Sequence, residues 1–223
     1  RLIFQHIDRA SITLARFTPQ RGGTYLPIPF ASTYIINPEN EDNECSKYCI
    51  LAYFLYVLYK PDKLTEELKK LYRDKERVKQ YQVFEELLKE DIEDIKQYRE
   101  ALQSNRTSEK VIPKHLGKQQ LNKIFQLLTD EQIAEIQTIL IDVCLEFPTT
   151  VSKGFDKFTT VNKDIAINVY EAILKDTESK RSDTVNNKQL NRDDFIIAPM
   201  RNKKDHFDRK CKINLLFLTD NGQ

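Results

Sequence analysis

The sequence predicts an α+β fold, in which a core helix and a small sheet are separated along the chain by a long helical segment. A polar loop is followed by a dense apolar run from Cys49 to Tyr59. Residues 63–103 are rich in Glu, Lys, Gln and Leu and contain neither Gly nor Pro, as is typical of helices. After Pro148, short stretches alternate between apolar and polar residues, which is the pattern of strands.

Composition narrows the class of protein. The 223 residues suffice for one sizeable domain, or for one domain with an insertion. Lys and Arg number 35 and Asp and Glu number 34, so net charge does not indicate nucleic-acid binding, although a local basic patch is still possible. The four cysteines form no CxxC pair, so we expect no metal or other cofactor, and reduced thiols suggest an intracellular protein, cytoplasmic or nuclear. The longest apolar run is too short to cross a bilayer, so no membrane association is expected.

The N-terminal part predicts a strand, an extended arm and then the core helix. Residues 11–17 alternate enough for a strand. Residues 25–30 should be extended, because each of their two prolines disfavours a helical conformation in the residue before it. The polar loop starts at Asn37, and the core helix should begin at Cys45 and end before Pro61.

Residues 62–147 predict an all-helical segment. Apolar residues recur at helical spacing at Leu64, Leu68, Leu71, Val78, Tyr81, Phe84, Leu88, Ile95, Tyr98 and Leu102. This pattern predicts one amphipathic helix of about 40 residues, with the spacing of a coiled-coil seam. A shorter helix at 118–128 and a capping box at 129–132 follow, and the apolar stripe continues to Phe147. The seam is either buried within the chain or a docking surface for a protein partner.

The C-terminal part predicts one helix and three strands. The helix is expected at 149–158, and strands are expected at 165–170, at 195–200 and at 213–219. Pro199 should end the second strand. The third is apolar on both faces, which predicts a central position in the sheet.

Cys45 is the main candidate for chemistry. A thiol at a helix N-terminus can be held as thiolate by backbone N–H groups and the helix dipole. The amides from Asp42 through Asn43 to Cys45 could hold an oxyanion. The alternative is an ordinary buried helix with an incidental cysteine. None of the three histidines, His6, His115 and His206, is placed opposite Cys45 by the sequence, and each is expected to be a surface residue.

Several segments, taken in order, resemble one family. They are Gly22–Pro29, Asn40–Cys45, Thr150–Ser152, Ile167–Tyr170 and Ile213–Leu216. In this order they resemble a module of Maverick/Polinton-type mobile elements and related viruses, found near the family-B DNA polymerase. The cysteine-helix motif is similar to that of ovarian-tumour (OTU) and papain-like cysteine proteases, in which an Asp precedes the nucleophile by three residues, as Asp42 precedes Cys45. Where OTU proteases have Gly and Asn, this chain has Asn43 and Glu44.

The resemblance implies a cysteine-protease-like core, with a central helix on a small, mostly antiparallel sheet. Residues 1–60 and 148–223 would form this core, and residues 61–147 would be a helical insertion. In the family module the base histidine lies on the strand after the one that matches 213–219, which would fall past Gln223.

Three functions follow as expectations. The first is a catalytically incomplete module that acts in protein–protein interaction through the insertion 62–147. The second is an active cysteine hydrolase that cleaves ubiquitin-like or peptide substrates with Cys45 as nucleophile. The third is a nucleic-acid-associated module of a replication polyprotein, with basic candidates at 201–204 and 209–212.

Overall fold

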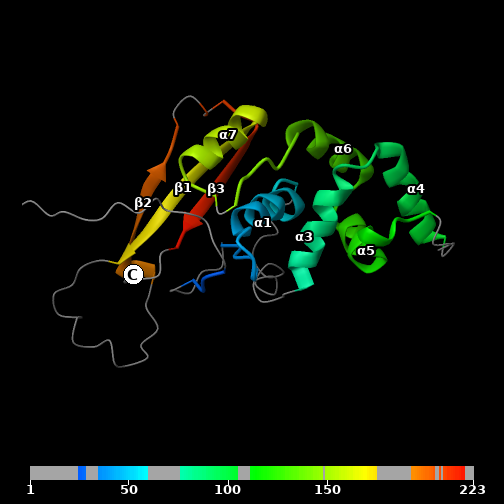
Figure 1. Ribbon diagram of the computed structural model, residues 1–223, viewed down its shortest axis with the longest axis horizontal. Coiled ribbons are helices and arrows are strands. Elements are labelled where there is room, and N and C mark those ends of the chain that lie inside the picture. The colour runs from blue at the N-terminus through cyan, green and yellow to red at the C-terminus, as the bar shows by residue number, and fades with distance from the viewer. Residues whose placement is uncertain are drawn as a thin grey trace, which may run out of the picture.

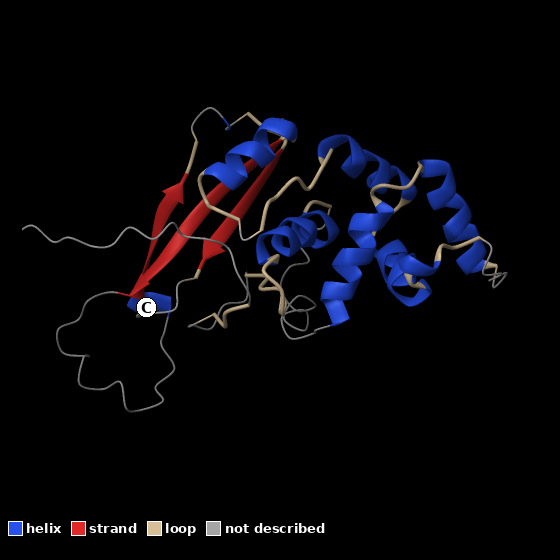
Figure 2. Ribbon diagram, in the orientation of Figure 1, coloured by secondary structure: helices blue, strands red, loops and turns tan. Residues whose placement is uncertain are grey.

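The protein is an α+β molecule in which a small sheet lies beside a group of short helices. The computed structural model describes residues 25–28, 35–59, 76–104, 111–147, 149–174, 192–203, 206 and 208–218. Helix α7 (Lys153–Val161) packs on the sheet, and helices α3 to α6, within residues 76–139, form a group at the opposite end of the molecule. Helix α1 (Cys45–Ala52) lies between the sheet and this group (Figures 1 and 2). The predicted strand at 11–17 and the start of the predicted long helix, up to residue 75, lie outside the described residues.

The predicted core helix is confirmed. Helix α1 (Cys45–Ala52) continues into the π-helical turn η1 (Tyr53–Val57). Phe54 in η1 has no exposed surface, and neither do Ile50 and Leu51 in α1. The apolar run therefore forms a helix that is buried on several sides, as expected for the centre of a core.

The predicted single long helix is wrong, because the chain turns between α3 (Glu76–Leu87) and α4 (Ile92–Gln103). The side-chain amide of Gln137, from a helix far along the chain, donates to the carbonyls of Leu88 at 3.2 Å and Glu90 at 2.8 Å. These bonds satisfy backbone groups that the turn removes from the helical pattern. A continuous coiled coil is therefore not formed across residues 76–104.

Helices α5 (Lys118–Leu127) and α6 (Asp130–Ile139) agree with the predicted helix and capping box. The Thr129 hydroxyl accepts from the Gln132 amide at 3.3 Å, and the Gln132 side chain accepts from the Thr129 amide at 3.0 Å. The predicted continuation to Phe147 is wrong, because α6 ends at Ile139 and residues 140–146 are not helical.

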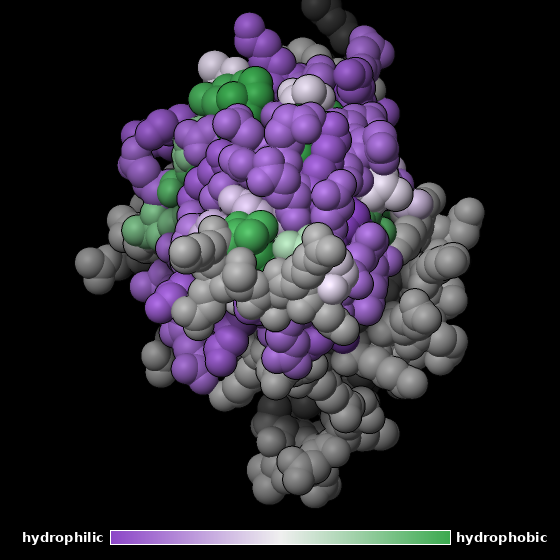
Figure 3. Space-filling model, turned by 90° about the vertical axis from the view of Figure 1, so that its right-hand side faces the viewer, coloured by the Kyte–Doolittle hydropathy of each residue, from purple (hydrophilic) through white to green (hydrophobic). Residues whose placement is uncertain are grey.

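The seam of the helical group is buried within the chain. The buried core includes Tyr81, Phe84, Leu87, Ile95, Tyr98, Leu121, Ile124, Leu128, Ile133, Ile136 and Leu140. These side chains belong to the same cluster as Phe54 of η1 and Phe158 of α7. Seen from the side of α4 and α5, the surface is mostly hydrophilic, with small separate hydrophobic patches (Figure 3). Of the two interpretations of the seam, burial within the chain is the one observed for its described part, whereas Leu64, Leu68 and Leu71 lie outside the described residues.

The sheet contains β1 (Ile165–Leu174), β2 (Phe195–Arg201) and β3 (Cys211–Phe217) in the order β2-β1-β3. Strand β1 pairs antiparallel with β2 and parallel with β3. The prediction of a mostly antiparallel sheet is therefore wrong, since the sheet is mixed.

The predicted central position of the strand at 213–219 is also wrong. Among the described strands β1 is central and β3 is at an edge. Ile165, Ala166 and Ile167 of β1 are buried in succession, whereas Lys212 and Asn214 of β3 are exposed. A strand buried on both faces belongs in the middle of a sheet.

The prediction that Pro199 ends the second strand is wrong, because Pro199 lies inside β2. It pairs with Tyr170, next to a register shift between Val169 and Tyr170. Proline lacks the amide proton of a sheet ladder, so it is tolerated at such irregularities and on outer strands.

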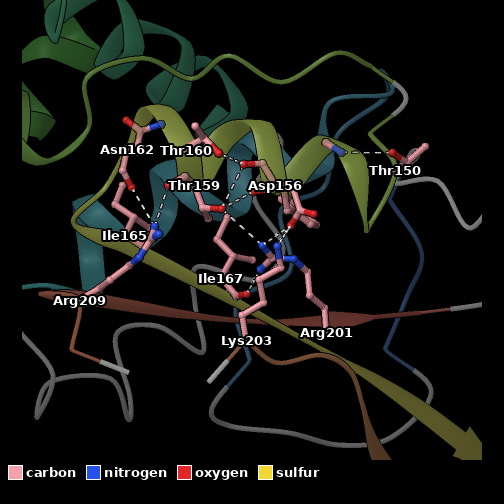
Figure 4. Close-up of polar contacts among 12 residues, drawn as sticks. Thr150, Asp156, Thr159, Thr160, Asn162, Ile165, Ile167, Arg201, Lys203 and Arg209 are labelled. Atoms are coloured by element: carbon pink, nitrogen blue, oxygen red, sulfur yellow. Dashed lines mark hydrogen bonds and ion pairs between the residues drawn. The ribbon is translucent and has the colours of Figure 1, made fainter. Parts of the chain in front are cut away.

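Two arginines bind α7 (Lys153–Val161) to the sheet. This helix starts later than predicted. Arg201 is buried, and it donates to the Ile167 carbonyl and, at 2.9 Å, to the Asp156 carboxylate (Figure 4). Arg209 donates to the carbonyls of Thr159 and Ile165, both at 2.7 Å. These two members of the basic segments 201–204 and 209–212 therefore serve contacts inside the molecule.

Candidate active site at Cys45

Cys45 lies at the first residue of α1 and opens into a cavity of about 490 Å³. The cavity is bounded by α1 and η1 on one side and by residues 212–218, which comprise most of β3 and the residue after it, on the other. Residues 25–28 and 35–37 contribute further parts of its wall, as do Val151 and Phe155 at the start of α7. Most of these side chains are apolar. The predicted thiol at a helix N-terminus is therefore present, and it borders an apolar cavity that the sequence did not predict.

Asp42 is held inside its own loop. Its carboxylate accepts hydrogen bonds from the Glu44 amide at 3.0 Å, the Asn40 side chain at 2.9 Å and the Tyr48 hydroxyl at 2.7 Å. Burial alone would raise the pKa of Asp42, but these three bonds and nearby Lys47 lower it below its ordinary value. Asp42 is thus a structural acceptor that shapes the approach to the helix.

The predicted oxyanion loop is only partly available to a ligand. The Glu44 amide donates to Asp42, and Asn43 is exposed in the bend. Of loop residues 41–44, none lies in the cavity wall, which reaches this segment at Cys45 and Ser46. The amides of these two residues precede the first bond of the helix, which the Lys47 amide makes to the Glu44 carbonyl at 2.9 Å. The donors best placed toward the cavity are therefore those of the first helical turn.

Lys47 offsets the negative charge of the acidic groups near Cys45, and this contact was not predicted from the sequence. Its ammonium pairs with Glu44 and, at 3.2 Å, with Glu85 of α3. Burial would lower the pKa of Lys47, but the two carboxylates raise it. A contact across elements such as Lys47–Glu85 has no signature in the local sequence.

Burial raises the pKa of each of the other three cysteines. Burial raises the pKa of Cys49, one turn along α1, and the Cys45 thiol next to it adds to this effect. Burial and nearby Asp142 raise the pKa of Cys144. Burial also raises the pKa of Cys211, and its buried side chain contacts Tyr53. All four cysteines are thiols.

The described histidines are not in the cavity wall. His115 is exposed in the helical group, with Nε2 3.8 Å from Glu90. The expected surface position of His206 is wrong, because this residue is buried. The His206 amide donates to the Lys203 carbonyl at 3.1 Å, and the His206 carbonyl accepts from the Arg209 amide at 3.3 Å. His6 lies outside the described residues.

The described residues hold no cluster of three or more His, Cys, Asp or Glu side chains that could bind a metal ion. None of the described helices has the length and apolar character needed to span a membrane. Comparison with known protein families, with curated proteins and with solved structures gives no match for this chain.

Proposed function

We propose that this chain is a cysteine-protease-like module, related to those of mobile elements, that binds an extended segment of a protein partner in the Cys45 cavity. The observation that carries the proposal is the position of Cys45, at the start of a buried helix and facing β3 across the cavity. Among the described residues no histidine lies in the cavity wall, and His6 lies outside the described residues. The activity proposed for the module is protein–protein interaction.

The chemistry of the cavity favours a peptide. Its apolar wall can take apolar side chains, as pockets for peptide side chains generally do. Strand β3 is at an edge of the described sheet, and an edge strand can pair with an extended backbone. Nucleic acid is less well supported, because Arg201 and Arg209 are engaged by α7 and β1.

An active cysteine hydrolase is the second candidate. It is favoured by the helix N-terminus at Cys45 and by the compensation of Glu44 through Lys47, since both would stabilise a thiolate. Peptide or isopeptide cleavage would also require a general base that removes the thiol proton and later protonates the leaving amine.

Two probes test the proposal on residues 1–223. Iodoacetamide should label Cys45 faster than Cys49 or Cys144, as measured by mass spectrometry of the modified peptides. An apolar peptide chloromethyl ketone should increase this preference about tenfold, which corresponds to about 1.4 kcal/mol of binding in the cavity. Val151→Lys should remove the peptide effect while leaving the iodoacetamide rate unchanged.

The outcomes separate the candidate functions. Equal labelling of these cysteines by both reagents would exclude a special role for Cys45. Turnover of a peptide or of a ubiquitin C-terminal substrate, abolished in Cys45→Ala and kept in Cys144→Ala, would establish the hydrolase instead. We expect no turnover.

A further inference from the structure

Helix α3 contacts Lys47 and Tyr48, the two α1 side chains that bind the loop leading into Cys45. Tyr48, one turn after Cys45, is fully buried, and its ring stacks on Tyr81 of α3 with centroids 6.1 Å apart. Its hydroxyl donates to Asp42 at 2.7 Å and accepts from the side chain of Gln82 at 3.3 Å. Tyr48 is therefore fixed by α3 on one side and holds the Asp42 carboxylate on the other.

A second contact reinforces the first. Lys47 joins Glu44 to Glu85, which lies one turn along α3 from Tyr81 and Gln82. Asp42 and Glu44, the two acidic residues nearest before Cys45, are thus held by side chains that α3 supports. Loop residues 41–43 are themselves exposed, so these contacts determine how the loop enters the helix.

We propose that Tyr48 is a positioning residue for Cys45, and that α3 holds it in place through Tyr81 and Gln82. This inference rests on the proposed function only in taking Cys45 as the functional residue. The Tyr48 hydroxyl holds one oxygen of the Asp42 carboxylate, while the other oxygen accepts from the Glu44 amide at 3.0 Å. The helical group thereby supports the site as well as the core.

Loss of the hydroxyl has a defined consequence. The Asp42 carboxylate would turn to the first-turn amides, the groups that would otherwise stabilise a thiolate. These contacts join Asp42, Glu44 and Lys47 at the start of α1 to Glu85 of α3, Lys212 of β3 lies in the cavity wall, and the Cys49 thiol lies one turn along α1. All of them are kept when only the hydroxyl is removed, so a change in Cys45 reactivity reports the positions of Asp42 and of Glu44, whose carboxylate lies 3.4 Å from the same hydroxyl.

The test compares Tyr48→Phe with Tyr98→Phe. The Tyr98 hydroxyl also donates to a carboxylate, that of Glu90 at 3.0 Å, but on the helical group. The rate of Cys45 alkylation by iodoacetamide is measured from about pH 6 to about pH 10, the range in which thiols titrate. In Tyr48→Phe the rate near neutral pH should fall about threefold, as loss of one hydrogen bond to a charged group allows, and the midpoint should move to higher pH. Tyr98→Phe should give the parent profile.

Other results would overturn the inference. A Tyr48→Phe profile that superimposes on the parent, or an equal shift in Tyr98→Phe, contradicts it. If Tyr48→Phe does not fold, Gln82→Met is the decisive variant, because the Gln82 side chain is exposed. Loss of its hydrogen bond to Tyr48 should shift the pH profile in the same direction by a smaller amount. A shifted profile without any preference for the apolar peptide probe would refute the proposed function and leave the role of Tyr48 standing.

Discussion

Asn162 shows how much of this fold depends on single buried polar side chains. It has no exposed surface, and its oxygen accepts from the amides of Ile141 at 2.8 Å and Asp142 at 3.2 Å. Its nitrogen donates to the carbonyls of Asp142 at 2.8 Å and Phe158 at 3.0 Å. One side chain thus joins the end of α7 to the segment that follows α6, and it satisfies backbone groups that have left the α6 helix.

Replacing Asn162 should therefore be costly. Asn162→Ala leaves buried amides and carbonyls without partners, so we expect a loss of about 2–3 kcal/mol in the free energy of unfolding. Urea titration measures it. Asn168→Ala is the matched control, since Asn168 bonds only to the exposed Asn214 side chain in the contacts described, and a change within about 0.5 kcal/mol is expected there. Equal losses in both variants would contradict this role.

At the scale of single residues, the sequence predicted the position of Cys45 from a local pattern. It did not predict residues that act through partners distant in the sequence. Cys45 could be placed because a polar loop next to an apolar run marks a helix start. Asn162, Tyr48 and Lys47 could not, because their partners lie on other elements. Asp42 was found by its spacing from Cys45, but its bond to Tyr48 became visible only in three dimensions.

At the scale of elements, the local sequence pattern predicted the presence of the helices more accurately than the residues at which they end. The capping box at Thr129 is confirmed because all its atoms come from four consecutive residues. The turn after α3 was missed because Gln137, which satisfies its carbonyls, lies on α6. The sheet order was missed because the sequences of the strands do not show how the connecting segments bring β1 between β2 and β3.

The helical seam provides a test of its internal burial. Phe84 has no exposed surface, whereas Leu88 at the turn is only partly buried. Phe84→Ala should lower the free energy of unfolding by about 3–4 kcal/mol, and Leu88→Ala should cost less. Chemical denaturation followed by circular dichroism gives both values. A small loss at Phe84 would mean that this face is not packed in solution.

At the scale of the whole molecule, α1 links the two halves. Tyr48 and Tyr56 contact Tyr81 of α3, and the same buried cluster continues to Phe155 and Ile167 on the sheet side. The division into a core at 1–60 and 148–223 with an insertion at 61–147 remains a prediction. The shared cluster indicates that the two parts depend on each other for stability.

A single unfolding transition should follow from this shared core. The loss of helical circular dichroism and the change in tyrosine fluorescence are expected to coincide in a thermal melt, as they do for a two-state domain. Phe54→Ala, at the junction, should lower both midpoints together. Two separated transitions, with only one moved by this substitution, would instead indicate independently folding parts.

The position of β3 also has a consequence for the order in which the protein is made. The wall of the cavity opposite Cys45 is formed by residues 212–218, and Arg209, which satisfies carbonyls at the end of α7, directly precedes it. A nascent chain emerges from its N-terminus, so the thiol and its helix leave the ribosome long before their opposite wall exists. During translation the Cys45 side of the core stays open to chaperones and oxidants, and it closes only as the last described strand joins β1.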